Sequence, residues 1–325
     1  MPATQRNIIL GRILILASLL VFAWSPTAAQ EKFPSRPVDV ICNWGAGGGA
    51  DQLARTLSGM AQKHLGVALP VSNAPGASGN TGLGKLVAAR ADGYTIGTLT
   101  GITVAAWAGG IGTYKPADFE YIALGQLSPS MLFVKSDGPF QTVQQLFAQA
   151  RENPGKLKVA TAGFGTIDDL TLKFLASKGV KMTNAPYAQA GERYASLLGG
   201  HTDVVYEEPG DVKAFLESKQ YRPVIVFAAK RMSEFPEVPT SVELGFPIEF
   251  PNWRSIVTKT GIPADRLRVL ADAYRKALES PEWKAFCTKD YSCIEYKTPE
   301  QFKAFVHAEF DAMTAFMKEH GLIKK

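Results

Sequence analysis

Cysteine and histidine are scarce in this sequence, with three cysteines and four histidines among 325 residues. No C-x-x-C pair and no Cys/His cluster occurs, which argues against a structural zinc site. No G-x-S-x-G or H-E-x-x-H motif is present, so no local signature of a hydrolase or zinc peptidase exists. A triad assembled from distant residues stays open, because spatial proximity cannot be read from a sequence. We interpret the histidines as surface or core residues: His64, His201, His307 and His320.

The sequence also lacks a cluster of basic residues and, beyond its start, a long apolar run. The formal net charge is +5 and the basic residues are scattered, which argues against a nucleic-acid surface. At the N-terminus, Arg6 and Arg12 flank a short apolar core over 13–24, and small residues end at Ala29. This layout predicts a cleavable signal peptide over 1–29. The alternative is an uncleaved anchor, but the apolar core is short for a membrane span.

Three glycine-rich turns, at 45–51, 75–82 and 162–168, are the most informative feature present. Each lies between a strand-like and a helix-like run, so bare amides and a helix N-terminus point at the same place. Several such turns in one cleft would form an anion site. None of the turns has the G-x-G-x-x-G spacing of a dinucleotide-binding loop. None ends in Gly-Lys-Ser or Gly-Lys-Thr, so a P-loop is excluded. The alternative for each turn is a tight connection, but nearby hydroxyls, including Ser78 and Thr166, favour capture of a carboxylate.

Strand-like and helix-like runs alternate along the chain, which predicts an α/β fold with mixed, mostly parallel sheets covered on both faces. Such sheets bind ligands beyond the carboxyl ends of their strands, where all three glycine turns are expected. The proline-rich stretch 235–251 reads as a connection. The expected strands are 38–44, 69–73, 94–99, 131–134, 157–161, 180–185, 204–206, 223–228 and 255–257, and the expected helices are 51–65, 81–90, 143–153, 168–178, 191–198, 211–219, 264–278, 281–287 and 299–319.

Several acidic and aromatic residues lie beside these turns. We interpret Asp51 and Asp168 first as helix N-caps that order the loops, and second as ligand contacts. Glu207 follows a strand and opens a helix; it either belongs to a helix-start cluster of acids or faces the ligand. A glutamate beside a ligand carboxylate would be repulsive without a mediator. Aromatic residues that could line the pocket, or simply pack in the core, are Trp44, Phe164 and Tyr187.

The cysteine spacing leaves two alternatives open. Cys287 and Cys293 are close enough in sequence to form a disulfide, with Cys42 as a buried free thiol, or all three are unpaired. Connectivity does not follow from sequence alone.

Blocks of sequence spread over the chain resemble the Bug family, the solute-binding proteins of tripartite tricarboxylate transporters. The first blocks are FPSRPV at 33–38 and WGAGGGADQLAR at 44–55, followed by NAPGASGNTG at 73–82 and ADGYT at 91–95. Later blocks are PY at 186–187, LGGHTD at 198–203 and VPTSVELG at 238–245. The resemblance implies a type II-like periplasmic binding protein whose two lobes close over a ligand about two crossover strands.

The resemblance also implies site residues, because family members hold a ligand carboxylate with backbone and hydroxyl groups, often through ordered waters. The matching positions here are Ala46, Gly47, Gly48, Asp51, Gly79, Thr161, Gly163, Thr166 and Asp203, to which the residues themselves add Ser78, Tyr187 and Glu207. The chain departs from the family where a serine and a histidine are common, at 166–169, and where Lys-Gly is common, at Ala188 and Gln189.

These observations predict an exported receptor that captures a small organic carboxylate and delivers it to the membrane components of a tripartite tricarboxylate-type transporter. The expected organisation is a signal peptide at 1–29, one lobe from 30–131 and 229–325, and a second lobe from 132–228. We expect a periplasmic monomer without catalysis, cofactor, metal or nucleic-acid partner. The alternatives are an enzyme acting on a small carboxylate in the same cleft, and a ligand sensor for a signalling partner.

Overall fold

The computed structural model describes residues 32–323, so the predicted signal peptide lies outside the described residues. The chain divides into residues 1–35 and residues 36–325, and every helix and strand below belongs to the second unit. No helix within residues 32–323 has the length and apolar character to cross a membrane.

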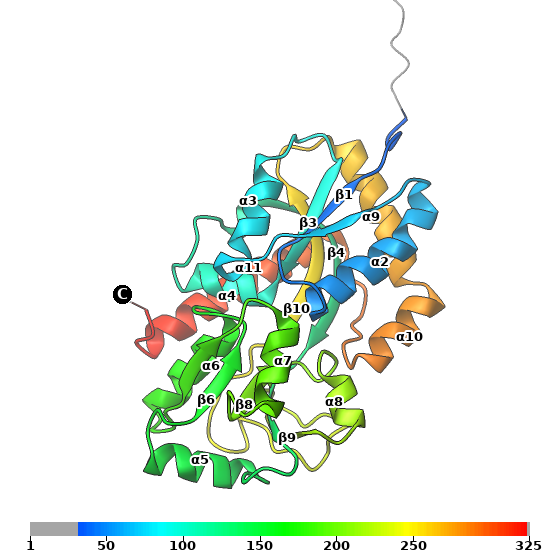
Figure 1. Cartoon of the computed structure of the whole chain (residues 1–325). Coiled ribbons are helices and arrows are strands. Elements are labelled where there is room, and N and C mark those ends of the chain that lie inside the picture. The colour runs from blue at the N-terminus through cyan, green and yellow to red at the C-terminus, as the bar shows by residue number, and fades with distance from the viewer. Residues whose placement is uncertain (1–31, 324–325) are drawn as a thin grey trace, which may run out of the picture. The chain divides into compact units, whose positions relative to one another are not determined.

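Residues 36–323 contain two five-stranded sheets, each built from segments that alternate with helices (Figure 1). The first sheet has the strand order β2-β1-β3-β10-β4, and the second has the order β7-β6-β8-β5-β9. The strands of the first sheet are β1 (Asp39–Cys42), β2 (Val71–Asn73), β3 (Thr95–Thr100), β4 (Phe119–Ser128) and β10 (Asn252–Lys259). Those of the second sheet are β5 (Met131–Lys135), β6 (Lys158–Thr161), β7 (Thr183–Pro186), β8 (Val204–Glu207) and β9 (Tyr221–Val226).

Both sheets are mixed, as predicted, but parallel pairing does not predominate. In the first sheet β1 is parallel to β2 and β3, whereas β10 is antiparallel to β3 and β4. In the second sheet β6 is parallel to β7 and β8, whereas β5 is antiparallel to β8 and β9. Parallel and antiparallel pairs are equally common because every antiparallel pair involves β5 or β10. These are the strands that follow the chain's two passages between the sheets.

Helices cover both faces of each sheet (Figure 1). On the first sheet, α3, α4 and α11 pack with one apolar cluster, while α2 and α9 contact the other face. On the second sheet, α5 and α6 cover one face and α7 the other. The helices are α2 (Gly49–Leu65), α3 (Asn80–Ala88), α4 (Gly101–Ala108), α5 (Val143–Glu152), α6 (Ile167–Ser177), α7 (Ala190–Leu198), α8 (Lys213–Glu217), α9 (Ala264–Leu278), α10 (Pro281–Lys289) and α11 (Pro299–Glu319), with 3-10 turns η2 (Ala77–Gly79) and η3 (Pro116–Asp118).

Strand periodicity explains how the second sheet separates its two cores. On β8, Val204 and Tyr206 belong to the cluster under α5 and α6, while Val205 belongs to the cluster under α7. Successive side chains of a strand point to opposite faces, so Glu207 falls on the α7 side with Val205. That placement brings its carboxylate to Arg193 of α7.

Helices α4 and α11 join the two cores. Phe302 and Val306 of α11 pack in the first-sheet cluster, whereas Met313 and Met317 pack in the second-sheet cluster. The start of α11 follows from local chemistry, because Pro299 stands in its first turn and Thr298 forms a capping box with Gln301.

Helix α4 and strand β4 were not expected. In α4 almost every residue is buried, so no polar stripe marks a helical period. The ten residues of β4 are mostly buried as well, which removes the polar–apolar alternation that marks a strand. Sequence periodicity therefore fails here because burial on several sides erases it.

Candidate functional site

The first glycine turn leads into α2, whose N-cap is Gly48 rather than Asp51. The expectation that Asp51 caps this helix is wrong, because the helix begins two residues earlier. Asp51 lies in the first turn and reaches back, so that its Oδ2 accepts a hydrogen bond from the Gly47 amide at 3.0 Å. Burial alone would raise the pKa of Asp51, but hydrogen bonds from Arg55, Gly47 and Asn73 hold it below its usual value.

The third glycine turn repeats this arrangement. Thr166 is the N-cap of α6, so Asp168 is not the cap that we expected. Instead Asp168 accepts a hydrogen bond from the Ala162 amide at 2.7 Å, and Asp169 accepts one from the Gly165 amide at 2.8 Å. Burial raises the pKa of Asp168 to about 7. Aspartates just inside each helix thus order the preceding turn with their own carboxylates.

Each of the three turns takes part in a contact between a loop of the first sheet and a segment of the second. Ser78 of the second turn donates a hydrogen bond to the Phe164 carbonyl of the third turn at 2.9 Å. The first turn packs against the start of α7, because a Cβ added at Gly48 would lie 3.1 Å from Cβ of Ala190. Segments that are far apart in sequence therefore converge on one place.

A cavity lies at this junction, beside the first turn and the start of α2. Its walls include Gly48 and Gly49, Thr100 at the end of β3, and the residues that follow β8. Its volume is about 30 Å³, which is room for about one water molecule. A larger hollow of about 580 Å³, beside Thr142 and Arg231, contacts none of the glycine turns.

Five charged side chains line the cavity. Arg254 of β10 contacts Glu208 and Asp211 at 2.6 Å each, which links the first sheet to the loop that follows β8. Asp211 Oδ2 also accepts a hydrogen bond from the Gly49 amide at 3.2 Å. A carboxylate of the protein therefore lies at the N-terminus of α2, where the positive end of the helix dipole favours an anion.

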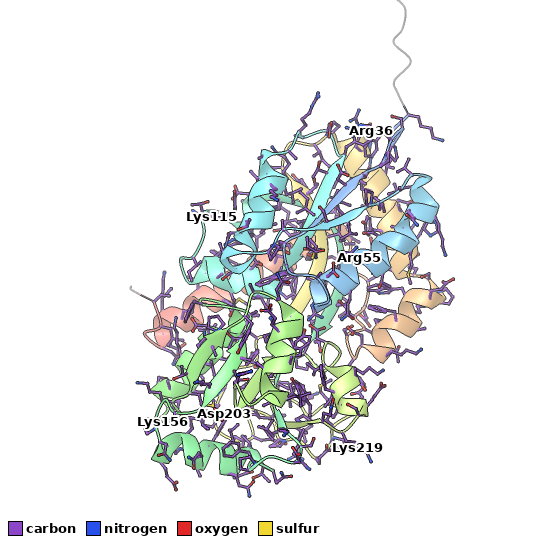
Figure 2. The ribbon with its side chains drawn as sticks, in the orientation of Figure 1. Arg36, Arg55, Lys115, Lys156, Asp203 and Lys219 are labelled. Atoms are coloured by element: carbon purple, nitrogen blue, oxygen red, sulfur yellow. A yellow bond between two sulfur atoms is a disulfide. The ribbon has the colours of Figure 1, made fainter. Side chains whose placement is uncertain are left out.

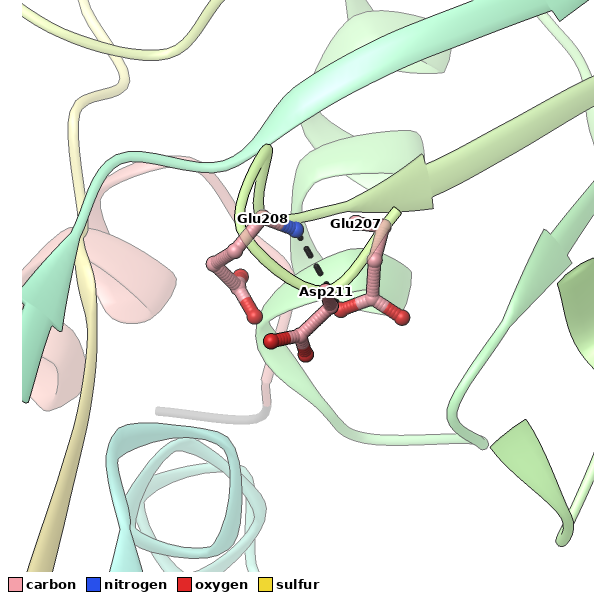
Figure 3. Close-up of side chains that lie close together, drawn as sticks. All are labelled: Glu207, Glu208 and Asp211. Atoms are coloured by element: carbon pink, nitrogen blue, oxygen red, sulfur yellow. Dashed lines mark hydrogen bonds between the residues drawn. The ribbon is translucent and has the colours of Figure 1, made fainter. Parts of the chain in front are cut away.

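Glu207, Glu208 and Asp211 form one compact group of acids, shown in Figure 3. One oxygen from each of Glu207, Glu208 and Asp211 lies within 4.8 Å of the others. Glu207 is bound by Arg193, whose Nε donates at 3.0 Å. Glu208 accepts further hydrogen bonds from Ser130 at 2.8 Å and from the Asn252 amide at 2.9 Å.

Acids outnumber bases at this place. The carboxyl groups that interact electrostatically here are Asp168, Glu207, Glu208, Asp211 and Asp290, against the guanidinium groups of Arg193 and Arg254 and the Lys213 ammonium, which acts on Asp290. Burial, reinforced by neighbouring acids, raises the pKa of Glu208 well above its usual value and that of Asp211 to about 8. Burial also opposes ionisation of Glu207, but Arg193 outweighs it and keeps its pKa low. The group as a whole resists carrying all of its negative charges at once.

Two buried acceptors at the cavity have no hydrogen-bond partner among the described residues: Asp211 Oδ1 and Asn252 Oδ1. The Asn252 side chain is fixed in orientation, because its Nδ2 donates to Glu208 and a flip would place two acceptors against each other. Both residues line the cavity.

The residues expected at the site are distributed unevenly. Gly48 and Glu207 line the cavity, and Ala46 and Gly47 belong to the same turn as Gly48. Ser78 and Gly163 lie at the contact between the second and third turns. The others make contacts that support these turns. Gly79 packs against Asn43 and Thr103, and the Thr166 hydroxyl donates to the Gly163 carbonyl. The Thr161 hydroxyl donates to Asn184, and the Tyr187 amide donates to the Thr161 carbonyl.

Asp203 lies away from the cavity. It precedes β8 and accepts a hydrogen bond from the Lys158 amide at 2.8 Å, at the amino ends of β8 and β6. Figure 2 labels it within the second-sheet half of the molecule, on the same side as Lys156. The cavity lies at the carboxyl ends of these strands, so the carry-over of Asp203 to the ligand is not supported by its position.

The aromatic residues and histidines contribute little to the cavity. Trp44 lines it, whereas Phe164 is 59% exposed and Tyr187 packs against the core under α7. No histidine within residues 32–323 is among the lining residues.

Sequence reasoning missed Arg193, Asp211, Asn252 and Arg254. The two arginines carry no local motif, and their partners lie 14 to 46 positions away in the sequence. One signal was available: Arg254 interrupts a strand whose other residues are almost all buried. A buried arginine in a strand needs a buried partner, and the acids after β8 supply it.

The cysteines adopt the first of the two alternatives. Cys287 and Cys293 are joined by a disulfide, at the end of α10, and Cys42 is a buried free thiol. Burial raises the pKa of Cys42 to about 11, which keeps the thiol protonated and inert.

Comparison with known proteins identifies the family. The sequence matches the family described as "Tripartite tricarboxylate transporter family receptor" (TctC) over residues 53–322. The chain belongs to this family. A protein of Cupriavidus necator, described as the UPF0065 protein in the gbd 5' region, is 31% identical over 98% of this chain and 99% of its own length.

Solved structures agree with this assignment. The receptor is similar to the periplasmic binding protein BugD, with 25% identity, a TM-score of 0.82, and coverage of 90% of this chain and 100% of the other. It also shares its fold with MatC from Rhodopseudomonas palustris, solved with bound malate, at 23% identity and a TM-score of 0.81 over 87% and 99% of the two chains. The resemblance to the Bug family and the two-sheet binding-protein fold are confirmed.

The TctC-family receptor differs at its cavity from what the resemblance implied. Several turn amides expected to hold a ligand carboxylate already bind the receptor's own carboxylates, from Asp51, Asp168, Asp169 and Asp211. Three of these acids belong to the helix that each turn precedes. Asp211 is different, because it comes from the opposite sheet.

Proposed function

We propose that this TctC-family receptor is exported to the periplasm, binds a small organic carboxylate in the cavity between its two sheets, and delivers it to the membrane components of a tripartite tricarboxylate-type transporter. The predicted cleavage after Ala29 belongs to this proposal. So do the lobe boundaries at 30–131 with 229–325, and at 132–228; the division of the strands between the sheets supports them to within one residue, since β5 begins at Met131.

The contact between Gly49 and Asp211 is the observation that carries the carboxylate assignment. The α2 amide and Arg254 together hold a carboxylate group, at 3.2 Å and 2.6 Å. A helix N-terminus beside a guanidinium is a suitable anion site, and here its occupant is a side chain from the opposite sheet. A ligand carboxylate of the same chemistry would replace Asp211 when the two sheets move apart. The malate bound to the similarly folded MatC is consistent with this ligand class.

Binding requires movement in this proposal, because about 30 Å³ is too small for a dicarboxylate. The chain passes between the sheets from β4 to β5 and from β9 to β10, and these passages would act as the hinge. Separation of the sheets would break the Arg254 ion pairs and open the cavity.

Two glycines of one helix provide a matched test. A Cβ at Gly49 would lie 2.2 Å from the Arg254 guanidinium carbon, whereas a Cβ at Gly59 meets nothing within 4 Å. We expect Gly49→Ala to weaken carboxylate binding by about tenfold or more, since the lobes can no longer close on the ligand. Gly59→Ala should bind normally and gain up to about 1 kcal/mol in helix stability. Thermal-shift screening with di- and tricarboxylates, followed by calorimetry, measures both.

The same ligand screen tests the remaining parts of the proposal. We propose that the receptor carries out no chemistry, so the bound compound should be recovered unchanged after long incubation. We also propose that it acts as a monomer, which light scattering with and without ligand measures. Equal carboxylate affinity in Gly49→Ala and wild type would contradict the placement of the ligand at α2.

A further inference from the structure

The cavity presents unpaired hydrogen-bond acceptors and surplus negative charge, neither of which binds a simple carboxylate. We propose that it binds an ammonium group, so that the natural ligand is an amino-carboxylate whose positive nitrogen is held by Asp211, Glu208 and Asn252. This inference rests on the proposed receptor function and specifies its ligand.

The side chain of Asn252 is the independent sign of a donor on the ligand. Asn252 is 3% exposed, lines the cavity and leaves its Oδ1 without a partner. A buried acceptor without a donor is costly, and native proteins leave few of them. Asp211 Oδ1 lacks a partner as well, although the Asp211 side chain is 2% exposed. The amide oxygen of Asn252 can only accept, so it requires a hydrogen-bond donor, which a carboxylate does not supply.

The charge balance favours a cationic donor over a neutral one. Arg254 is shared between Glu208 and Asp211, and Arg193 is taken by Glu207. One negative charge of this group therefore has no counterion of its own. Burial is the main cause of the raised pKa values of Glu208 and Asp211, and the neighbouring acids add to it. An ammonium group would supply the missing positive charge in a dry site, where it is worth most.

The dimensions fit an ammonium group. Three acceptors placed tetrahedrally about an ammonium nitrogen at about 2.9 Å lie about 4.7 Å from one another. Glu208 and Asp211, two of the three proposed acceptors, belong with Glu207 to a group whose oxygens lie within 4.8 Å of one another, and Asn252 lines the same small cavity. A divalent metal ion fits less well, because a charge of +2 would lie beside the Arg254 guanidinium.

Matched ligand pairs that differ only by an amino group test the proposal. Calorimetry at pH 7.5 with succinate and aspartate, glutarate and glutamate, and adipate and 2-aminoadipate should give at least about tenfold tighter binding for an aminated member. In Asp211→Asn and in Asn252→Leu, this ratio should fall toward one. The exposed Glu217→Gln is the control, and its ratio should equal that of wild type.

The ratio within a pair separates ligand recognition from a structural defect. A variant that merely impairs closure weakens both members equally and leaves the ratio unchanged, and that result would overturn the assignment of Asp211 and Asn252. Plain dicarboxylates that bind as tightly as their aminated partners would overturn the ammonium site while leaving the receptor function intact. If no carboxylate of either kind binds, both proposals fail. A thermal shift caused by Ca²⁺, Mg²⁺ or Zn²⁺ alone and removed by EDTA would replace the ammonium site with a metal site.

Discussion

The two walls of the cavity differ in charge: the first-sheet wall is positive and the second-sheet wall is mainly negative. The first-sheet wall presents backbone amides at the start of α2, together with the Arg254 guanidinium. The second-sheet wall presents Glu207, Glu208 and Asp211, with only Arg193 to offset them. The Arg193–Glu207 pair lies within one wall, whereas the Arg254 pairs join the two walls. Of these ion pairs, only those of Arg254 depend on how the two sheets are placed, so only their loss can reveal whether the two walls have closed.

Loss of Arg254 should have the largest effect, because it removes the bond between the walls and leaves two buried acids without their partner. We expect Arg254→Met to lower the free energy of unfolding by about 3–5 kcal/mol, measured by urea denaturation. The matched control is Arg231→Met, since Arg231 pairs with Glu243 on the surface at 3.0 Å. An exposed pair contributes about 1 kcal/mol or less.

Small-angle scattering gives a second readout for Arg254→Met. If the Arg254 ion pairs hold the walls together, the ligand-free variant should have a larger radius of gyration than wild type. A variant that is as stable and as compact as wild type would show that the walls are held by other contacts.

A change of pH should have an intermediate effect through Asp211. Its pKa is about 8 in the folded protein, raised mainly by burial from an ordinary value of 3.8. The folded state therefore holds more protons than the unfolded chain between these values, so the free energy of unfolding falls as the pH rises through this window. The charged groups that act on Asp211 come from β8, β10, α7 and the end of α10: Glu207, Glu208, Arg254, Arg193 and Asp290.

Denaturation of the ligand-free protein measures this dependence. We expect the free energy of unfolding to fall by about 3 kcal/mol between pH 6 and pH 9. In Asp211→Asn the decline should be shallower, because the substituted amide does not titrate. Stability that rises with pH over this range would contradict the assigned charge state of the second-sheet wall.

The contrast between the walls also shows which parts of the molecule are readable from sequence. Helices α9 and α11 were predicted with their observed bounds, since each has a clear start and a regular apolar stripe. The glycine turns were also located from local sequence, because their glycines stand between a strand-like run and a helix-like run. The acid–arginine contacts were not, because they join segments such as 208 and 254 that only the topology of two sheets brings together. A cavity built from long-range pairs leaves little trace in any one stretch of sequence.

The contact between the second and third turns should have the smallest effect, although it also joins loops of the two sheets. Ser78 donates one hydrogen bond to the Phe164 carbonyl at 2.9 Å, near solvent that can replace it. We expect Ser78→Ala to cost about 1 kcal/mol or less, with Ser233→Ala, whose hydroxyl contacts the neighbouring Glu234, as the control. The informative quantity is the coupling of Ser78→Ala to Arg254→Met in a double-mutant cycle. If both contacts form only in the closed arrangement, Ser78→Ala should have almost no further effect once Arg254 is lost. Additive effects would mean that the turn contact and the ion pairs respond to different movements, and that the two walls do not close as one unit.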